Sequence, residues 1–226
     1  MQKISHTEEN YLKAIFKISE KTGRNASTNG IAQALDTSAA SVTDMVKRLS
    51  EKSLINYEKY KGVTLTEKGN EIATLLIRKH RLWEVFLVDK LSFSWDEVHE
   101  IAEQLEHIKS SDLVGRLDNF LGNPKFDPHG DPIPDEEGNF TFRKQVLLSD
   151  LQPGEDGVIV GVQDHSSQFL QYLDKMKLVL GVTVNVIERY EYDESLKVKI
   201  NNRGKQFSLS KKVCQNLFVQ KQKHGV

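Results

Sequence analysis

Hydrophobic positions in the first 55 residues recur at helical spacing and predict three helices. The first would bury a face made of five apolar side chains: Tyr11, Leu12, Ile15, Phe16 and Ile18. We expect Thr7 to cap this helix, with Asn10 three residues on, and Gly23 to end it. Two further apolar-faced segments follow within residues 28–55 and are separated by a polar turn at 36–38. Short helix, tight turn and longer helix form the helix-turn-helix layout.

The next segment changes from helical spacing to alternation. Ile55 and Tyr57, then Val63 and Leu65, alternate around a basic turn that contains Gly62. Alternation of this kind around a glycine-containing turn predicts a β-hairpin. A hairpin directly after a helix-turn-helix predicts a winged helix over residues 1–73.

The remainder of the chain is predicted to hold a helical part and a small β part. Helical spacing resumes over 67–90, capped by Thr66, and again over 95–109 and 111–121. The loop 122–139 contains four of the five prolines and is the clearest linker. Beyond it, 145–164 and 182–210 are typical of short strands with turns, with a helix at Ser166–Lys177 between them. This predicts a small barrel over 143–226 and a helical domain over 74–142, in a fold that is mainly α with a smaller β part.

Composition narrows the functional class. The 226 residues suffice for two or three small domains, and the single cysteine, Cys214, excludes an internal disulfide. There is no apolar run of 18 residues and no apolar signal region, so we expect a cytoplasmic protein without a membrane partner. The net charge of −1 hides an acidic middle: residues 71–142 carry 7 Lys+Arg against 15 Asp+Glu, whereas both ends are mildly basic. Cations would favour the middle and polyanions the ends, although unevenly charged solvated surfaces are also common.

The winged helix predicts binding to double-stranded DNA, with the second helix of the helix-turn-helix in the major groove. Hydroxyl and charged side chains suit phosphates or base edges, alanine can meet thymine methyl groups, and basic wing residues suit the backbone. The same layout also occurs in protein-interaction domains, so the fold alone does not decide. The candidate DNA-binding residues are Ser38, Ala40, Ser41, Thr43, Asp44, Lys47, Lys59 and Lys61.

The stretch HEIAEQLEHI, residues 99–108, suggests a metal site. Four of its polar side chains fall within a sector of about 100° at helical geometry. A further histidine and glutamate, His80 and Glu84, are spaced i, i+4 on the preceding helix. A single pair of this kind is usually a solvated face, but the two together offer six donors without a thiolate: His80, Glu84, His99, Glu103, Glu106 and His107. Imidazole with carboxylate suits Mn²⁺ or Fe²⁺, and Zn²⁺, Co²⁺ and Ni²⁺ are expected to bind in vitro.

Taken together, these segments resemble the diphtheria toxin repressor family of iron-dependent repressors and manganese transport regulators, over almost the whole chain. The resemblance is carried by TEENYLKAIF, SVTDMVKRLSEKSLI, LTEKG, RKHRLWE, VHEIAEQLEHIKS and GDPIP. It implies a metal-activated, dimeric repressor of metal-uptake genes that binds a palindromic operator. It also implies an N-terminal winged helix, a helical dimerisation and metal-binding domain, and a C-terminal SH3-like (FeoA-type) β-barrel.

The resemblance further implies two metal sites. The primary site would use Asn10, Glu103, Glu106 and His107. Iron-type members have Met and Cys at the positions of Asn10 and Glu103, whereas manganese-type members have Asp and Glu, so Glu103 is manganese-like and Asn10 matches neither type. Lys13 stands where manganese-type members supply a glutamate to a binuclear site, which argues against a second ion there.

The ancillary site that the resemblance implies would use His80, Glu84, His99, His165 and Gln168. In family members with a barrel, a Glu stands at the position of His165. The linker pair Asp127 and His129 resembles a further ligand pair of streptococcal-type members, in which the first residue is Cys.

Two other function classes remain open at this point. One is a metal-independent transcription factor that senses a small ligand through the barrel. The other is a metalloenzyme, although the chain has no phosphate-binding glycine loop, no Ser/His/Asp signature and no evident catalytic base beyond the ligands. We therefore expect a protein that is not an enzyme.

Overall fold

The computed structural model describes residues 4–58, 61–201 and 206–222, and the chain divides into two compact units. The first unit comprises Met1–Trp83, Ala102–Phe120 and Ile133–Phe140. The second comprises Glu84–Ile101, Leu121–Pro132 and Thr141–Val226. Each unit has its own hydrophobic core.

Helix α1 (His6–Thr22) has its N-cap two residues earlier than predicted, at Ser5 instead of Thr7. Ser5 is the N-cap, because its hydroxyl accepts from the backbone of Glu8 while the Glu8 carboxylate accepts from the Ser5 backbone. The expectation that Thr7 caps this helix is therefore wrong. Gly23 ends the helix as predicted, in the left-handed conformation with φ 62°.

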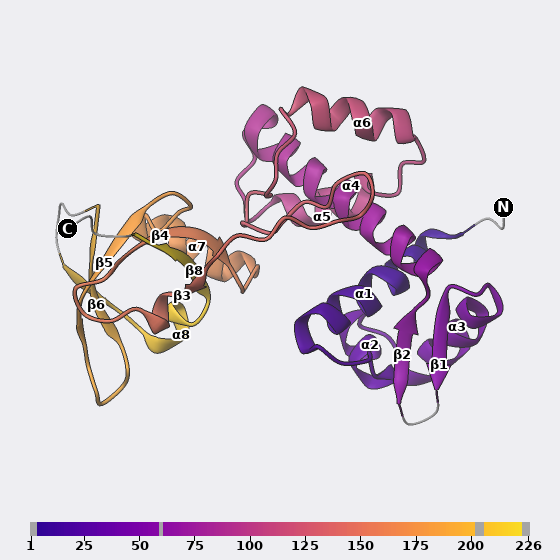
Figure 1. The fold of residues 1–226 in the computed structure, drawn as a ribbon, viewed down its shortest axis with the longest axis horizontal. Coiled ribbons are helices and arrows are strands. Elements are labelled where there is room, and N and C mark those ends of the chain that lie inside the picture. The colour runs from indigo at the N-terminus through magenta and orange to yellow at the C-terminus, as the bar shows by residue number, and fades with distance from the viewer. Residues whose placement is uncertain (1–3, 59–60, 202–205, 223–226) are drawn as a thin grey trace. The chain divides into compact units, whose positions relative to one another are not determined.

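The predicted winged helix is confirmed. Helices α2 (Thr28–Ala34) and α3 (Ala39–Glu51) lie beside the antiparallel hairpin of β1 (Ile55–Glu58) and β2 (Gly62–Leu65) (Figure 1). Leu12, Ile31, Leu49 and Val63 are fully buried in the shared core. The Lys59 and Tyr60 positions at the predicted wing tip lie outside the described residues.

Three further helices follow the hairpin. Helix α4 (Glu67–Leu91) begins after Thr66, whose hydroxyl accepts from the Gly69 backbone as predicted. Helix α5 (Val98–Leu105) is shorter than the expected 95–109, because Ile108 N donates to Leu105 O in a tighter turn that ends it. Helix α6 is Ser111–Phe120. Among the helices of the described residues, none combines the length and apolar character needed to span a membrane.

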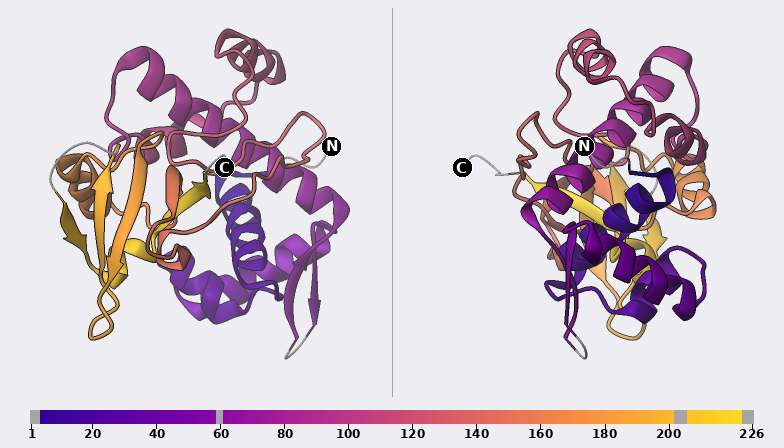
Figure 2. Two further views of the ribbon diagram at one scale, coloured as in Figure 1. Left: turned by 60° about the vertical axis from the view of Figure 1, so that its left-hand side comes forward. Right: turned by 90° about the vertical axis from the view of Figure 1, so that its right-hand side faces the viewer.

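The second unit contains the predicted small β structure. Its six-stranded antiparallel sheet has the order β3-β8-β4-β5-β6-β7 and is strongly curved (Figure 2). Helix α7 (Ser167–Met176) follows β4, and its Leu170 and Leu173 are buried in the core. Bulges in the β4–β8 and β5–β6 pairings help the sheet to curve, as is typical of SH3-like barrels. The elements are β3 (Val146–Leu147), η1 (Leu148–Asp150), β4 (Asp156–Val162), β5 (Thr183–Arg189), β6 (Leu196–Ile200), β7 (Phe207–Leu209), α8 (Lys211–Cys214) and β8 (Leu217–Lys221).

Candidate functional site

The first unit gathers charged and imidazole side chains where α1 meets the end of α5. We call the following residues the primary cluster: Asn10, Lys13, His80, Glu103, Glu106 and His107. Asn10 is included because the resemblance assigns it to this site and because it shares a face of α1 with Lys13. Lys13 Nζ lies 2.5 Å from Glu103 Oε1 and 2.6 Å from Glu106 Oε1. The Lys13 side chain is 7% exposed and that of Glu106 is 0% exposed. A buried ammonium thus joins α1 to both carboxylates, an arrangement that the sequence did not predict.

His80, from α4, makes a second contact to the carboxylate of Glu106. Its Nδ1 lies 2.6 Å from Glu106 Oε2. His80, Glu103 and Glu106 each offer a ligand atom, and these atoms lie within 4.8 Å of one another. His80 therefore contacts a residue of the predicted primary set, whereas the resemblance assigned it to the ancillary set.

Asn10 is the one member of the primary cluster with an unsatisfied buried atom. Among the described residues, its Oδ1 is buried and has no hydrogen-bond partner. Such an atom carries a desolvation cost that a cation can offset. Asn10 and Lys13 are three residues apart on α1, so they share one face of the helix. An amide oxygen, two carboxylates and an imidazole form a donor set that suits a hard or borderline divalent ion, so the residues present fit a metal.

His107 completes the primary cluster from the turn after α5. Its Nδ1 lies 2.7 Å from Glu9 Oε2, and its Nε2 lies 3.8 Å from Glu106 Oε1. The ring of His6 stacks on it at 4.3 Å between centroids, with 6° between the planes. Sequence spacing did not indicate Glu9 or His6, because both lie about a hundred residues away along the chain.

The second unit holds a separate group of candidate ligands, which we call the ancillary cluster: Glu84, His99, Asp127, His129 and His165. His99 Nδ1 lies 3.4 Å from Glu84 Oε1, which brings together two residues of the predicted ancillary set. Glu84, Asp127 and His129 are all buried and offer ligand atoms within 4.8 Å of one another. Asp127 and His129 of the linker thus lie close to Glu84, the predicted ligand on α4. His129 is only 2% exposed, although a histidine in a proline-rich loop is usually solvated.

Hydrogen bonds define how His129 is presented. Its Nε2 lies 2.8 Å from the Trp95 carbonyl oxygen, which can only accept, so Nε2 carries the proton. Its Nδ1 therefore faces Glu84 Oε2, 3.6 Å away. Burial opposes protonation of Nδ1, but the interaction with Glu84 and the charge of Asp127 outweigh it and raise the pKa of His129 to about 9. A divalent ion would replace that second proton.

The loop that carries His129 is fastened to the sheet. Val162 N donates to His129 O at 3.0 Å, and Arg143 Nη2 donates to Gly130 O at 2.7 Å. Gly130 has φ 92°, and a Cβ at this position would collide with the carbonyl oxygen of Val160. The GDPIP segment therefore begins with a glycine because a larger residue would push the loop off β4.

The two barrel residues of the predicted ancillary set differ in their surroundings. His165 stacks on His129 with 4.8 Å between centroids, and its Nε2 lies 4.0 Å from Asp131 Oδ2. The His165 side chain is 36% exposed, and the partial desolvation of its ring, together with the nearby charge of His129, lowers its pKa, which favours the neutral form that binds metals. Gln168 is exposed on the first turn of α7, and no hydrogen bond among the described residues joins it to the ancillary cluster.

The candidate DNA-binding residues of α3 lie on one exposed surface. Ala40, Asp44 and Lys47 are exposed along the helix. Ser38 is the N-cap and accepts from Ser41 N, and Thr43 Oγ1 donates to Ala39 O, so part of their hydrogen-bonding capacity is used locally. Lys61 is exposed and pairs with Glu58 on the wing, whereas Lys59 lies outside the described residues.

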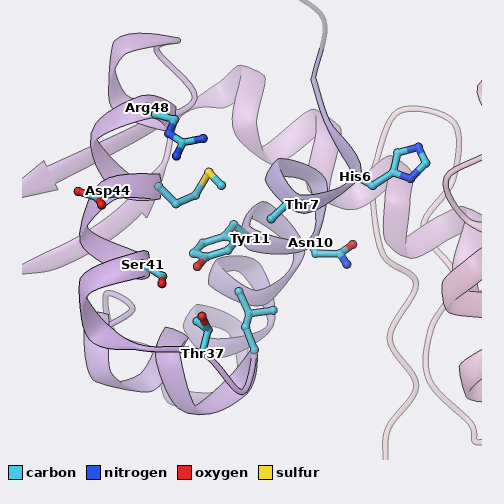
Figure 3. A pocket seen from close by; sticks show the side chains of 10 residues that line it. His6, Thr7, Asn10, Tyr11, Thr37, Ser41, Asp44 and Arg48 are labelled. Atoms are coloured by element: carbon cyan, nitrogen blue, oxygen red, sulfur yellow. The ribbon is translucent and has the colours of Figure 1, made fainter.

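A pocket of about 490 Å³ separates α3 from the start of α1 (Figure 3). Tyr11 points toward Ser41 of α3, whereas Asn10 and His6 point away from α3. Helix α1 therefore presents one face to α3 and another to the primary cluster.

Comparison with known proteins places the chain in a family. Residues 3–63 match the family described as "Iron dependent repressor, N-terminal DNA binding domain", 66–135 match "Iron dependent repressor, metal binding and dimerisation domain", and 146–221 match "FeoA domain". The iron-dependent repressor IdeR of Mycobacterium leprae is 31% identical over 186 residues, which cover 78% of this chain and 80% of that protein. The IdeR of Mycobacterium tuberculosis H37Rv is 38% identical over 134 residues, and the match spans 58% of that protein's length and 59% of this chain.

A solved structure is similar over nearly the whole fold. It is titled "Manganese-dependent transcriptional repressor complex with manganese", and it aligns with a TM-score of 0.86 and 33% identity. The alignment covers 95% of this chain and 100% of that one. From its sequence, its fold and its clustered metal-type donors, the chain belongs to the family of iron- and manganese-dependent transcriptional repressors.

Proposed function

We propose that this chain is a Mn²⁺- or Fe²⁺-dependent repressor that acts in the cytoplasm as a homodimer on a palindromic operator and controls metal-uptake genes. Three functional parts divide the work: 1–73 binds DNA, 74–142 binds metal and dimerises, and 143–226 is the FeoA-type barrel. The observation that carries the proposal is the buried Oδ1 of Asn10, which has no hydrogen-bond partner within the described residues and lies on a helix that also reaches the carboxylates of Glu103 and Glu106.

At the primary cluster we propose one divalent ion, held by Asn10, Glu103, Glu106 and His107. When bound, the ion supplies two positive charges that neutralise the paired carboxylates and link them to α1. Lys13 contributes one of the charges that a second ion would bring, and its ammonium would repel such an ion. We therefore propose a mononuclear primary site.

At the ancillary cluster we propose a second ion held by Glu84 and His99, with Asp127, His129 and His165 as further donors. The resemblance adds His80, which precedes Glu84 by one turn of α4, and Gln168. The buried Glu84–Asp127–His129 group supports the linker pair as ligands more strongly than Gln168, which is exposed.

The regulatory mechanism follows from linkage. Metal favours only those arrangements in which α1 lies against the end of α5, and it shifts the equilibrium by its preference for them. If the same arrangement aligns the two α3 helices of a dimer with the operator, metal and DNA strengthen each other's binding. Couplings of this kind are about 1–3 kcal/mol, or roughly 5- to 150-fold in affinity.

The test is fluorescence anisotropy of promoter DNA from the chain's own gene, titrated with protein in Mn²⁺, Fe²⁺, Zn²⁺ or chelator. We expect Mn²⁺ or Fe²⁺ to tighten binding, and Glu106→Ala or His107→Ala to abolish the gain while circular dichroism stays unchanged. Asp112→Ala is the matched control, because it removes an exposed acid from the same acidic region. Operator binding that ignores metal in the unsubstituted protein, or metal stimulation that survives both substitutions, would sink the proposal.

A further inference from the structure

The two ring nitrogens of His107 have different surroundings. Nδ1 lies 2.7 Å from Glu9 Oε2, within hydrogen-bonding distance. Nε2 lies 3.8 Å from Glu106 Oε1, beyond that distance. Both partners are nearly buried, with side-chain exposures of 9% for His107 and 13% for Glu9. Water therefore competes little for either nitrogen.

This asymmetry determines which nitrogen carries the proton in the neutral ring. An ionised carboxylate can only accept hydrogen bonds, so Glu9 requires the proton to be on Nδ1. The lone pair is then on Nε2, which faces the primary cluster. The ammonium of Lys79 also interacts electrostatically with Glu9.

A second contact from α1 restrains the plane of the ring. His6 stacks almost parallel on His107, and it lies three residues before Glu9, on the same face of α1. The hydrogen bond fixes rotation about the ring axis, and the stack limits tilting. Helix α1 thus orients a side chain that belongs to the turn after α5.

We propose that Glu9 is a positioning residue of the primary site, which holds His107 in the Nδ1-protonated tautomer so that Nε2 is presented to the ion. The inference rests on the proposed metal function and deepens it. Carboxylates behind metal-binding histidines raise the basicity of the ligand, and their loss typically weakens metal binding about 10- to 100-fold. Because Glu9 precedes Asn10 on α1, this helix would contribute twice: once as a ligand and once by orienting another ligand.

The first measurement needs no metal. Long-range ¹H–¹⁵N correlation spectra of the metal-free, full-length protein with ¹⁵N-labelled histidine report the tautomer of each ring, and His107→Gln identifies the His107 signals. We expect the Nδ1-protonated form for His107, and a mixed or reversed population in Glu9→Ala. An Nε2-protonated ring in the unsubstituted protein would overturn the proposal.

The second measurement is calorimetric titration with Mn²⁺. We expect Glu9→Ala to bind about 10- to 100-fold more weakly at unchanged stoichiometry. Glu9→Gln should lie between Glu9→Ala and the unsubstituted protein, because its amide oxygen can still accept from Nδ1. Glu20→Ala, which removes an exposed carboxylate from the same helix, should have no effect. Glu9→Gln also provides the answer if Glu9→Ala does not fold.

Two calorimetric outcomes would contradict the positioning role. Unchanged Mn²⁺ affinity in both Glu9 variants would mean that the contact is only structural. Loss of one ion per chain in Glu9→Ala would mean that Glu9 is itself a ligand. A failure of the proposed function looks different, because metal would then not affect DNA binding even though the tautomer of His107 in the metal-free protein remained as expected.

Discussion

Replacing Lys13 by methionine tests whether a buried ammonium stands in for part of the positive charge at the primary cluster. Methionine keeps most of the length and apolar surface of the lysine stem but removes the charge. Three short contacts are lost: one to Glu103 at 2.5 Å and two to Glu106 at 2.6 and 2.8 Å. Glu106 is then left fully buried, with the His80 ring 2.6 Å from its Oε2.

The magnitude follows from this burial. Removing one partner of a buried ion pair typically costs about 3–5 kcal/mol, because the other charge stays buried without compensation. For chains of this size, 1 kcal/mol lowers Tm by about 2–4 °C, so the metal-free variant should melt roughly 6–20 °C lower. A divalent ion can supply the missing charge. The rise in Tm on adding Mn²⁺ should therefore be larger in Lys13→Met than in the unsubstituted protein.

Calorimetric melting in chelator and in excess Mn²⁺ measures both quantities. Lys52→Met is the matched control, because Lys52 pairs at 2.6 Å with the carboxylate of Glu8, a buried residue that is not a member of the primary cluster. Its loss of stability should be the same with and without Mn²⁺. The reasoning is refuted if Lys13→Met loses no stability in chelator, or if Mn²⁺ raises its Tm no more than that of the unsubstituted protein.

Two further predictions concern the second unit. His129→Ala should weaken metal binding at the ancillary cluster more than His165→Ala does, because His129 faces Glu84 in the buried interior whereas His165 is partly exposed. Competition with a chromogenic chelator measures both affinities, and equal effects would contradict this order. Cys214 should resist thiol reagents at pH 8 in the folded protein, because burial raises the pKa of its thiol to about 11 and leaves little thiolate. If the folded protein reacts as fast as the protein unfolded in urea, the thiol is not buried.

Local signals explain why the order of elements could be predicted. The helix-turn-helix, the hairpin and the strands each depend on apolar spacing and turn residues within a few positions. The errors were also local. A hydroxyl cap was expected at Thr7, but Ser5 is followed three residues later by Glu8, and this reciprocal capping signal predicts the observed start. Helix α5 ends early because its last turn tightens, which apolar spacing does not register.

The site could be predicted only in part. Residues that share a helix or follow it directly, such as Glu103, Glu106 and His107, were identified because helical geometry relates them. The partners of these residues were not, because each comes from a distant segment: Lys13 and Glu9 lie on α1, about 90 or more residues before the residues they contact. The burial of His129 likewise depends on Gly130 and Arg143 fastening a proline-rich loop to β4.

By itself, then, the sequence determined the winged helix, the helical middle, the small β domain and the types of donor atom, because periodicity and side-chain chemistry are local properties. Only the tertiary structure decided which donors share a cluster, which charges are buried and which nitrogen of each histidine is presented. The physical reason is that burial and hydrogen-bond partners depend on contacts between distant segments. Those contacts, and above all the ammonium of Lys13 between two carboxylates, set the electrostatics of the primary cluster.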